Sequence, residues 1–79
     1  MPDFFLHIVE RGQSLKDEQG IDAPDLAAAR AEAFRIVREL LHSGSWSLAD
    51  AGNHVNIADR SGRVLDTVAV WEVTTKPPR

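Results

Sequence analysis

Polar and apolar residues along the chain follow two different periods. Between Asp25 and His42, apolar residues recur every three to four positions and fall on one side of a helix turning 100° per residue: Leu26, Ala29, Ala33, Ile36, Val37, Leu40 and Leu41. Charged residues occupy the opposite side. The pattern predicts one amphipathic helix, with Asp25 as its N-cap and Gly44 as a left-handed residue just past its end.

The segments on either side of this helix alternate with a period of two, as strands do. Residues 4–10 place Phe4, Leu6 and Ile8 on one face, and the other face then receives Phe5, His7 and Val9. A turn at residues 11–13 and a short polar edge strand at residues 14–17 complete a first hairpin. Trp46 and Leu48, beyond the helix, are expected to fold back over the core.

A second hairpin is predicted around Asp59-Arg60-Ser61-Gly62, which has Asp at the first and Gly at the last position of a turn. Its strands are residues 54–58 and 63–73. An uninterrupted register places Ile57 opposite Leu65. Leu65, Thr67, Ala69 and Trp71 would then face the helix, and Val64, Val68 and Val70 would lie on the opposite face.

These elements predict an α+β fold in the order β-β-α-β-β, a small antiparallel or mixed four-stranded sheet with one helix packed on one face. Both a 2-1-4-3 strand order and a fully antiparallel order fit the pattern. Residues 1–79 would form a single small domain, with an ordered core at about residues 3–73 and a frayed tail at residues 74–79.

The sheet face away from the helix is the candidate interaction surface: Phe5, His7, Val9, Val64, Val68 and Val70. A monomer would expose an apolar patch there that small soluble domains rarely tolerate. Stacking two such sheets, or pairing an edge strand with a second copy, would cover it. The expected partner is therefore a second copy, as a homodimer, or another protein.

Composition narrows the functional classes. The chain has no cysteine, hence no disulfide and no thiol nucleophile, and its net charge is −3. The negative charge argues against general binding to nucleic acids or anionic membranes. The N-terminal apolar run is too short to span a membrane, and the cytoplasm is the expected location.

A basic helix flank leaves weak nucleic-acid binding as an alternative. Its residues are Arg30, Arg35 and Arg38, which Arg60 and Arg63 could extend. Glu32 and Glu39 lie on the same exposed side and favour pairing with Arg35 within the helix instead.

Motifs that carry chemistry are missing from the sequence. No two histidines have the spacing of a helical metal pair, and a site made of His7, His54 and Asp66 has no motif behind it. Turn and cap roles account for the acidic residues near the helix entrance: Asp17, Glu18, Asp22 and Asp25. We therefore predict no catalytic residue, no metal site, no cofactor and no small-molecule ligand.

Several short motifs resemble, as a set, a family of short bacterial proteins, mostly from soil α-proteobacteria, that is known as a domain of unknown function. They are the aromatic first strand, Asp17-Glu18-x-Gly20, Pro24-Asp25-Leu26, the alanine-rich helix opening and Asp59-x-x-Gly62-Arg63-Val64-Leu65. The resemblance covers residues 4–70 and brings no catalytic residue. The expected function is a non-enzymatic interaction module, with a regulatory or antitoxin-like module that masks a partner protein as the alternative.

Overall fold

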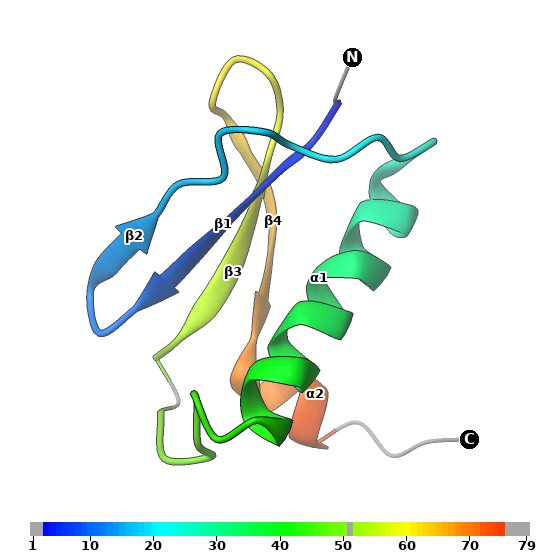
Figure 1. Cartoon of the computed structure of the whole chain (residues 1–79). Coiled ribbons are helices and arrows are strands. Elements are labelled where there is room, and N and C mark those ends of the chain that lie inside the picture. The colour runs from blue at the N-terminus through cyan, green and yellow to red at the C-terminus, as the bar shows by residue number, and fades with distance from the viewer. Residues whose placement is uncertain (1–2, 51, 76–79) are drawn as a thin grey trace.

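One antiparallel sheet of four strands carries a long helix across one face, as the computed structural model shows (Figure 1). The structure describes residues 3–50 and 52–75. In chain order the elements are β1 (Phe5–Glu10), β2 (Gln13–Leu15), α1 (Leu26–His42), β3 (His54–Ala58), β4 (Val64–Ala69) and α2 (Val70–Thr75). The predicted β-β-α-β-β order is confirmed, and α2 is an additional short helix.

The strand order is β2-β1-β3-β4, and every neighbouring pair is antiparallel. Of the two orders that the sequence allowed, the fully antiparallel one is therefore found. The 2-1-4-3 order is wrong because β3, not β4, pairs with β1. Leu6 lies opposite Ile57, and Ile8 lies opposite Val55, so apolar side chains from both hairpins meet beneath α1.

Local chemistry fixes both ends of α1 as predicted. Oδ1 of Asp25 accepts a hydrogen bond from the Ala28 amide at 2.9 Å, which satisfies one of the free N–H groups of the first turn. At the other end, Gly44 adopts a φ of 85°, and its amide donates to the carbonyl of Leu41. Ala29 and Ala33 are fully buried, since small side chains let the helix axis approach the sheet.

The loop after α1 closes one end of the core with Trp46, which is 2% exposed, as expected from the sequence. The same expectation for Leu48 is wrong, because this residue is 69% exposed. Ser47 and Asp50 explain the difference. The Asp50 amide donates to the Ser47 carbonyl, and the Ser47 amide donates to the Asp50 carboxylate, so that Leu48 lies in the middle of a turn that faces solvent.

A buried asparagine joins the first hairpin to the rest of the sheet. Arg11 and Gly12 form the two-residue loop between β1 and β2, with φ values of 51° and 79°. Asn53 is 4% exposed, and its Oδ1 accepts from the Arg11 amide at 3.0 Å. Its backbone carbonyl accepts from the amide of Val70 at the start of α2. Asn53 thus links the hairpin tip, β3 and α2.

The register between β3 and β4 contains a β-bulge. Ala58 lies opposite Val64, as the predicted hairpin loop requires, but Ile57 lies opposite Asp66 instead of Leu65. Leu65 is the extra residue, with no counterpart on β3. A one-residue shift moves every following side chain to the other face of the sheet.

The bulge reverses the predicted faces of β4. Val68 and Val70 are 0% and 2% exposed and belong to the core under α1, so their assignment to the opposite face is wrong. Thr67 and Ala69 lie on the side that α1 leaves uncovered, and Leu65 is 39% exposed; their predicted helix-facing positions are wrong for the same reason.

The predicted return strand over residues 63–73 is too long, because the chain turns into α2 at Val70. The side chain of Glu72 accepts from the Ala69 amide at 3.3 Å and so bonds a free N–H at the start of this helix. Trp71, which was expected on the helix-covered face, is 58% exposed. Residues 74–75 of the predicted frayed tail belong to α2, and residues 76–79 lie outside the described residues.

Candidate interaction surface

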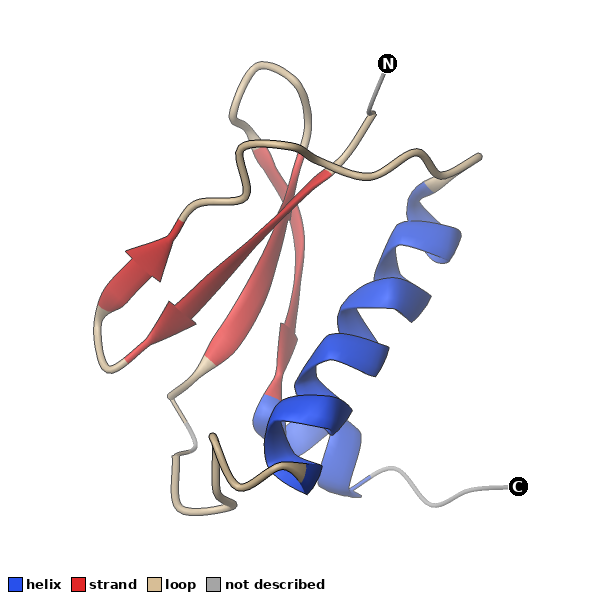
Figure 2. Cartoon of the chain, viewed as in Figure 1, coloured by secondary structure: helices blue, strands red, loops and turns tan. Residues whose placement is uncertain are grey.

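The sheet has one face covered by α1 and one face without a helix among the described residues (Figure 2). The molecule measures 34 × 32 × 19 Å, and the shortest dimension corresponds to one sheet layer and one helix layer. α2 packs against α1 and β4. We call the uncovered side the outer face.

Cross-strand partners share a face, so the registers define the residues of the outer face. Phe5 is paired with Ala58, His7 with Asn56, and Val9 with His54. β4 extends these pairs on the same side. On β1, β3 and β4 the outer face therefore consists of Phe5, His7, Val9, His54, Asn56, Ala58, Val64, Thr67 and Ala69.

Acidic side chains, lysine and arginine are all missing from these outer-face residues of β1, β3 and β4. The chain as a whole has nine basic and twelve acidic residues. Depletion of charge, together with apolar and aromatic side chains, distinguishes the centre of protein interfaces from ordinary surface. The composition of the outer face is thus that of an interface centre.

Several polar atoms on the outer face are already hydrogen-bonded within the molecule. Oγ1 of Thr67 donates to Oδ1 of Asn56 at 2.8 Å. Nδ1 of His7 accepts from the Asp17 amide at 3.0 Å, and Nδ1 of His54 lies 2.9 Å from the Gly52 carbonyl oxygen. Bringing this face against a partner would cost less than burying unpaired polar groups, because these atoms keep their partners.

Aromatic and aliphatic groups complete the outer face. The rings of Phe5 and His7 are stacked, with centroids 6.4 Å apart and planes inclined by 20°. Ala58 is fully buried although it lies on this side, next to its cross-strand partner Phe5. Val64 is the most open apolar residue of the face, with 51% of its surface exposed.

Asp17 anchors the segment that runs beside the outer face. Its carboxylate accepts from three backbone amides, those of Leu6, Gln19 and Gly20, at 3.0–3.1 Å. Burial alone would raise the pKa of the Asp17 carboxyl, but the amides of Gly20, Leu6 and Gln19 together lower it below its usual value. The turn role that the sequence suggested for this residue is confirmed.

Four of the six predicted surface residues lie on the outer face: Phe5, His7, Val9 and Val64. Val68 and Val70 do not, because the bulge at Leu65 turns both into the core. Sequence reasoning missed Thr67 and Ala69 on this face for the same reason. The sequence did carry one signal: a continuous register would have left the charged Asp66 among apolar residues.

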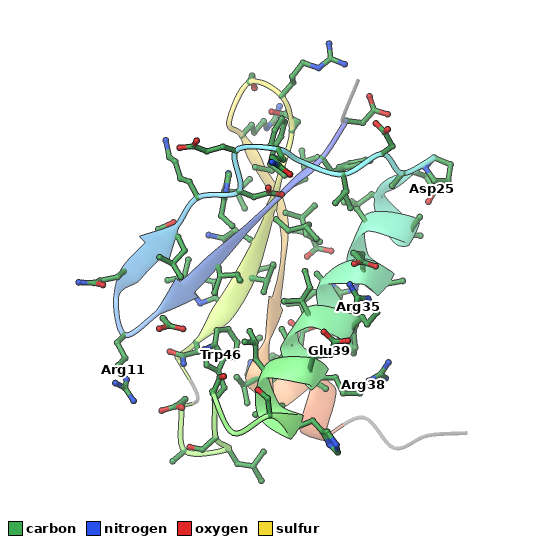
Figure 3. All side chains as sticks on the ribbon, in the orientation of Figure 1. Arg11, Asp25, Arg35, Arg38, Glu39 and Trp46 are labelled. Carbon is green, nitrogen blue, oxygen red and sulfur yellow. The ribbon has the colours of Figure 1, made fainter. Side chains whose placement is uncertain are left out.

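The basic flank of α1 is largely neutralised. Arg35 pairs with Glu32 at i−3 and with Glu39 at i+4, as predicted. These carboxylates raise the pKa of the Arg35 guanidinium. Figure 3 labels Arg35 and Glu39 on α1. Arg30 pairs with Asp66 and Glu72, which the sequence did not indicate. Beyond the helix, Arg60 lies 3.6 Å from the carboxylate of Asp3.

The structure does not bring His7, His54 and Asp66 together as a metal site. Asp66 faces α1, on the opposite side of the sheet from His7 and His54. Across residues 3–50 and 52–75, no group of three or more potential ligands of the types His, Cys, Asp and Glu is placed to hold a metal ion.

A groove of about 500 Å³ lies at the C-terminal end of α1, away from the outer face. Its described lining residues are Arg38, Glu39, His42 and Ser43, whose side chains are of mixed charge. Within the described part of the chain, neither helix combines the length and apolar character needed to cross a membrane.

Comparison with known proteins gives one family match. No curated protein and no solved structure matches the chain. The model of a domain of unknown function, DUF6894, matches residues 3–71, from the residue before the first bridge to the start of α2. The resemblance to a domain of unknown function is thereby confirmed, and the chain belongs to the family of this domain, DUF6894.

Proposed function

We propose that the protein is a small non-enzymatic interaction module that binds protein through its outer face, and that its first partner is a second copy of itself. One observation carries the proposal: the outer-face residues of β1, β3 and β4 include no acidic, lysine or arginine side chain, and several of their polar atoms already have hydrogen-bond partners. An uncharged face is complementary to itself. Two copies can therefore meet without bringing like charges together.

Sheet stacking supplies a geometry for this homodimer. Two sheets that pack face to face lie about 10 Å apart with their strands inclined by about 30°. A twofold axis through the outer face would set the same patch of each copy against the other. Phe5 and Val9 would then lose their remaining exposure to water, a gain of about 25 cal/mol for each Å² of apolar surface buried.

Charge insertion into the outer face tests the proposal. Size-exclusion chromatography with light scattering at micromolar concentration should give a dimer for the natural chain. Val9→Lys and Val64→Lys should give monomers, because each places an ammonium group in an apolar interface. Leu48→Lys is the matched control, since Leu48 is an exposed aliphatic residue in a turn outside the face. It should remain a dimer.

Two results would count against this proposal. A monomeric natural chain would remove the self-association, and dimeric Val9→Lys and Val64→Lys variants would place the interface elsewhere. If the chain is monomeric and yet binds a different protein in a manner that Val9→Lys abolishes, the outer face serves a regulatory or antitoxin-like module that masks a partner.

Nucleic-acid binding through the arginine flank receives less support, because Arg30, Arg35 and Arg60 all have carboxylate partners. Binding of this kind should appear as salt-sensitive retardation of RNA or DNA. The cytoplasmic location expected from the sequence stays a prediction.

A further inference from the structure

We propose that Arg30, Asp66 and Glu72 close the free edge of β4 against the addition of a further strand. β4 is the last strand in the sheet order, so one of its edges has no strand neighbour. Open edges of this kind pair readily with a strand of another chain. The occupant that is kept out here is β4 of a second copy, which would otherwise extend one sheet into the next.

The evidence lies in three backbone groups of β4. In an antiparallel sheet, alternate residues turn their N–H and C=O groups away from the paired strand, so Thr67 and Ala69 share an orientation. The Thr67 amide donates to Oδ1 of Asp66 at 2.8 Å. The Thr67 carbonyl accepts from Nη1 of Arg30 at 3.4 Å, and the Ala69 amide donates to Oε2 of Glu72. Side chains thus hold three of the backbone groups that an added strand would need.

These side chains come from three different elements and hold each other in place. Nη1 of Arg30, on α1, lies 2.8 Å from Oδ2 of Asp66 on β4, and Nη2 contacts Oε1 of Glu72 on α2. The guanidinium also lies over the Phe34 ring, with Cζ 5.5 Å from its centroid. We call Arg30, Asp66 and Glu72 the edge cluster.

The bulge at Leu65 makes the edge cluster possible. Asp66 faces α1 only because the extra residue shifts the register, and in a continuous register it would point to the outer face. The opposite edge of the sheet is protected in another way, since β2 has only three residues. With both sheet edges protected, a second copy would bind at the outer face and not along an edge strand.

Binding of a peptide strand to the β4 edge tests whether the edge cluster closes that edge. The probe is a fluorescein-labelled peptide that copies residues 62–70, and its binding is followed by fluorescence anisotropy. The double variant Arg30→Leu/Glu72→Ala removes the bonds to the Thr67 carbonyl and the Ala69 amide while keeping an aliphatic stem at position 30. Arg35→Leu is the matched control, because Arg35 is on the same helix and also pairs with two glutamates.

The double variant should bind the peptide at least tenfold more tightly than the natural chain or Arg35→Leu does. The Ala69 amide, which loses its bond to Glu72, should exchange with solvent at least tenfold faster in the free variant and slow down again with peptide. Equal binding by the natural chain would overturn the closure. So would a folded double variant, with the Val68 amide still protected, that gains no affinity.

If the double variant does not fold, Glu72→Ala alone keeps the pair between Arg30 and Asp66 and frees the Ala69 amide. It should then gain affinity for the peptide by at least threefold, and no gain would contradict the closure. The peptide assay measures binding at the β4 edge alone. Its expected result is therefore the same whether or not the outer face forms a dimer.

Discussion

Trp46 donates its indole N–H to Oε1 of Glu10 at 2.8 Å, linking the loop after α1 to the end of β1. The ring is 2% exposed, and the Trp46 backbone amide donates to the carbonyl of Leu40 at 2.9 Å. In Figure 3 the Trp46 side chain lies where the loop after α1 returns toward the sheet. A buried tryptophan with a satisfied N–H contributes both apolar area and orientation. Trp46 therefore closes one end of the core.

Trp46→Ala should lower the free energy of unfolding by about 3–5 kcal/mol, the usual cost of removing a large buried aromatic ring. Trp46→Phe should cost less, because it keeps an aromatic ring in place and loses only the bond to Glu10 and part of the buried ring area. Urea denaturation followed by circular dichroism measures both. Leu48→Ala, at an exposed turn residue, is the control and should stay within about 0.5 kcal/mol. A loss at Leu48 as large as at Trp46 would contradict this assignment.

Acid should weaken the fold through Asp17. The folded state holds the pKa of this carboxyl below its usual value, so the charged form is favoured by folding. That contribution is fully present above the unfolded pKa of about 3.9 and is lost as the pH falls through the lower folded pKa. Asp17→Asn should cost about 1–2 kcal/mol at neutral pH, because an amide offers a weaker acceptor to the three backbone groups.

The Asp17→Asn variant should also lose less stability than the natural chain between about pH 5 and pH 2, since the linked group is gone. Urea midpoints measured across this range provide the comparison. Asp22→Asn makes the same change of charge at an exposed carboxylate beside the same turn, and it should keep the natural pH dependence. If Asp22→Asn flattened the profile as much as Asp17→Asn, the three amides would not be the cause.

The N-cap of α1 gives a third test. Asp25→Ala removes the acceptor for the Ala28 amide and should cost about 1 kcal/mol, which for a domain of this size lowers the Tm by about 4–8 °C. Asp25→Ser keeps a capping oxygen and should recover most of the loss. Thermal unfolding by circular dichroism distinguishes the two variants. Equal losses for alanine and serine would show that the side-chain cap is unimportant here.

Sequence reasoning succeeded where the determinants are local. Asp25 and Gly44 act within four residues of their own positions, and the pairs that Arg35 makes lie within one helical turn. Capping and i, i+4 chemistry of this kind depends on residue type and spacing alone. The first strand also alternates without interruption. Its outer residues Phe5 and Val9 could therefore be assigned to the correct face.

Prediction failed where distant contacts decide the structure. From Val64 to Val70, apolar residues occupy both odd and even positions, so alternation does not select a face. The observed face depends on a bulge and on the pairing of Asp66 with Arg30, 36 residues away in the sequence. Residues 70–75 are rich in β-branched side chains and favour a strand by propensity. The contacts of Glu72 with the Ala69 amide and Arg30 accompany a helix there instead.

The bulge leads to the last prediction, which concerns the deletion of Leu65. Without this residue, Val64 is followed directly by Asp66, and the register that joins Ala58 to Val64 continues to Ile57 and Asp66 with no irregularity. Every later side chain of β4 keeps its face. The deletion should therefore cost no more than about 1.5 kcal/mol, because Leu65 is partly exposed and contributes little buried area.

Insertion of one alanine between Asp66 and Thr67 is the matched comparison, since it changes the length of the same strand by one residue. It turns Thr67 inward and moves Val68 and Val70 out of the core, with an expected cost above about 3 kcal/mol. Urea denaturation gives both free energies, and a nuclear Overhauser contact between Val55 and Val68 reports the register. If deletion and insertion proved equally damaging, Leu65 would not be the residue that the sheet leaves unpaired.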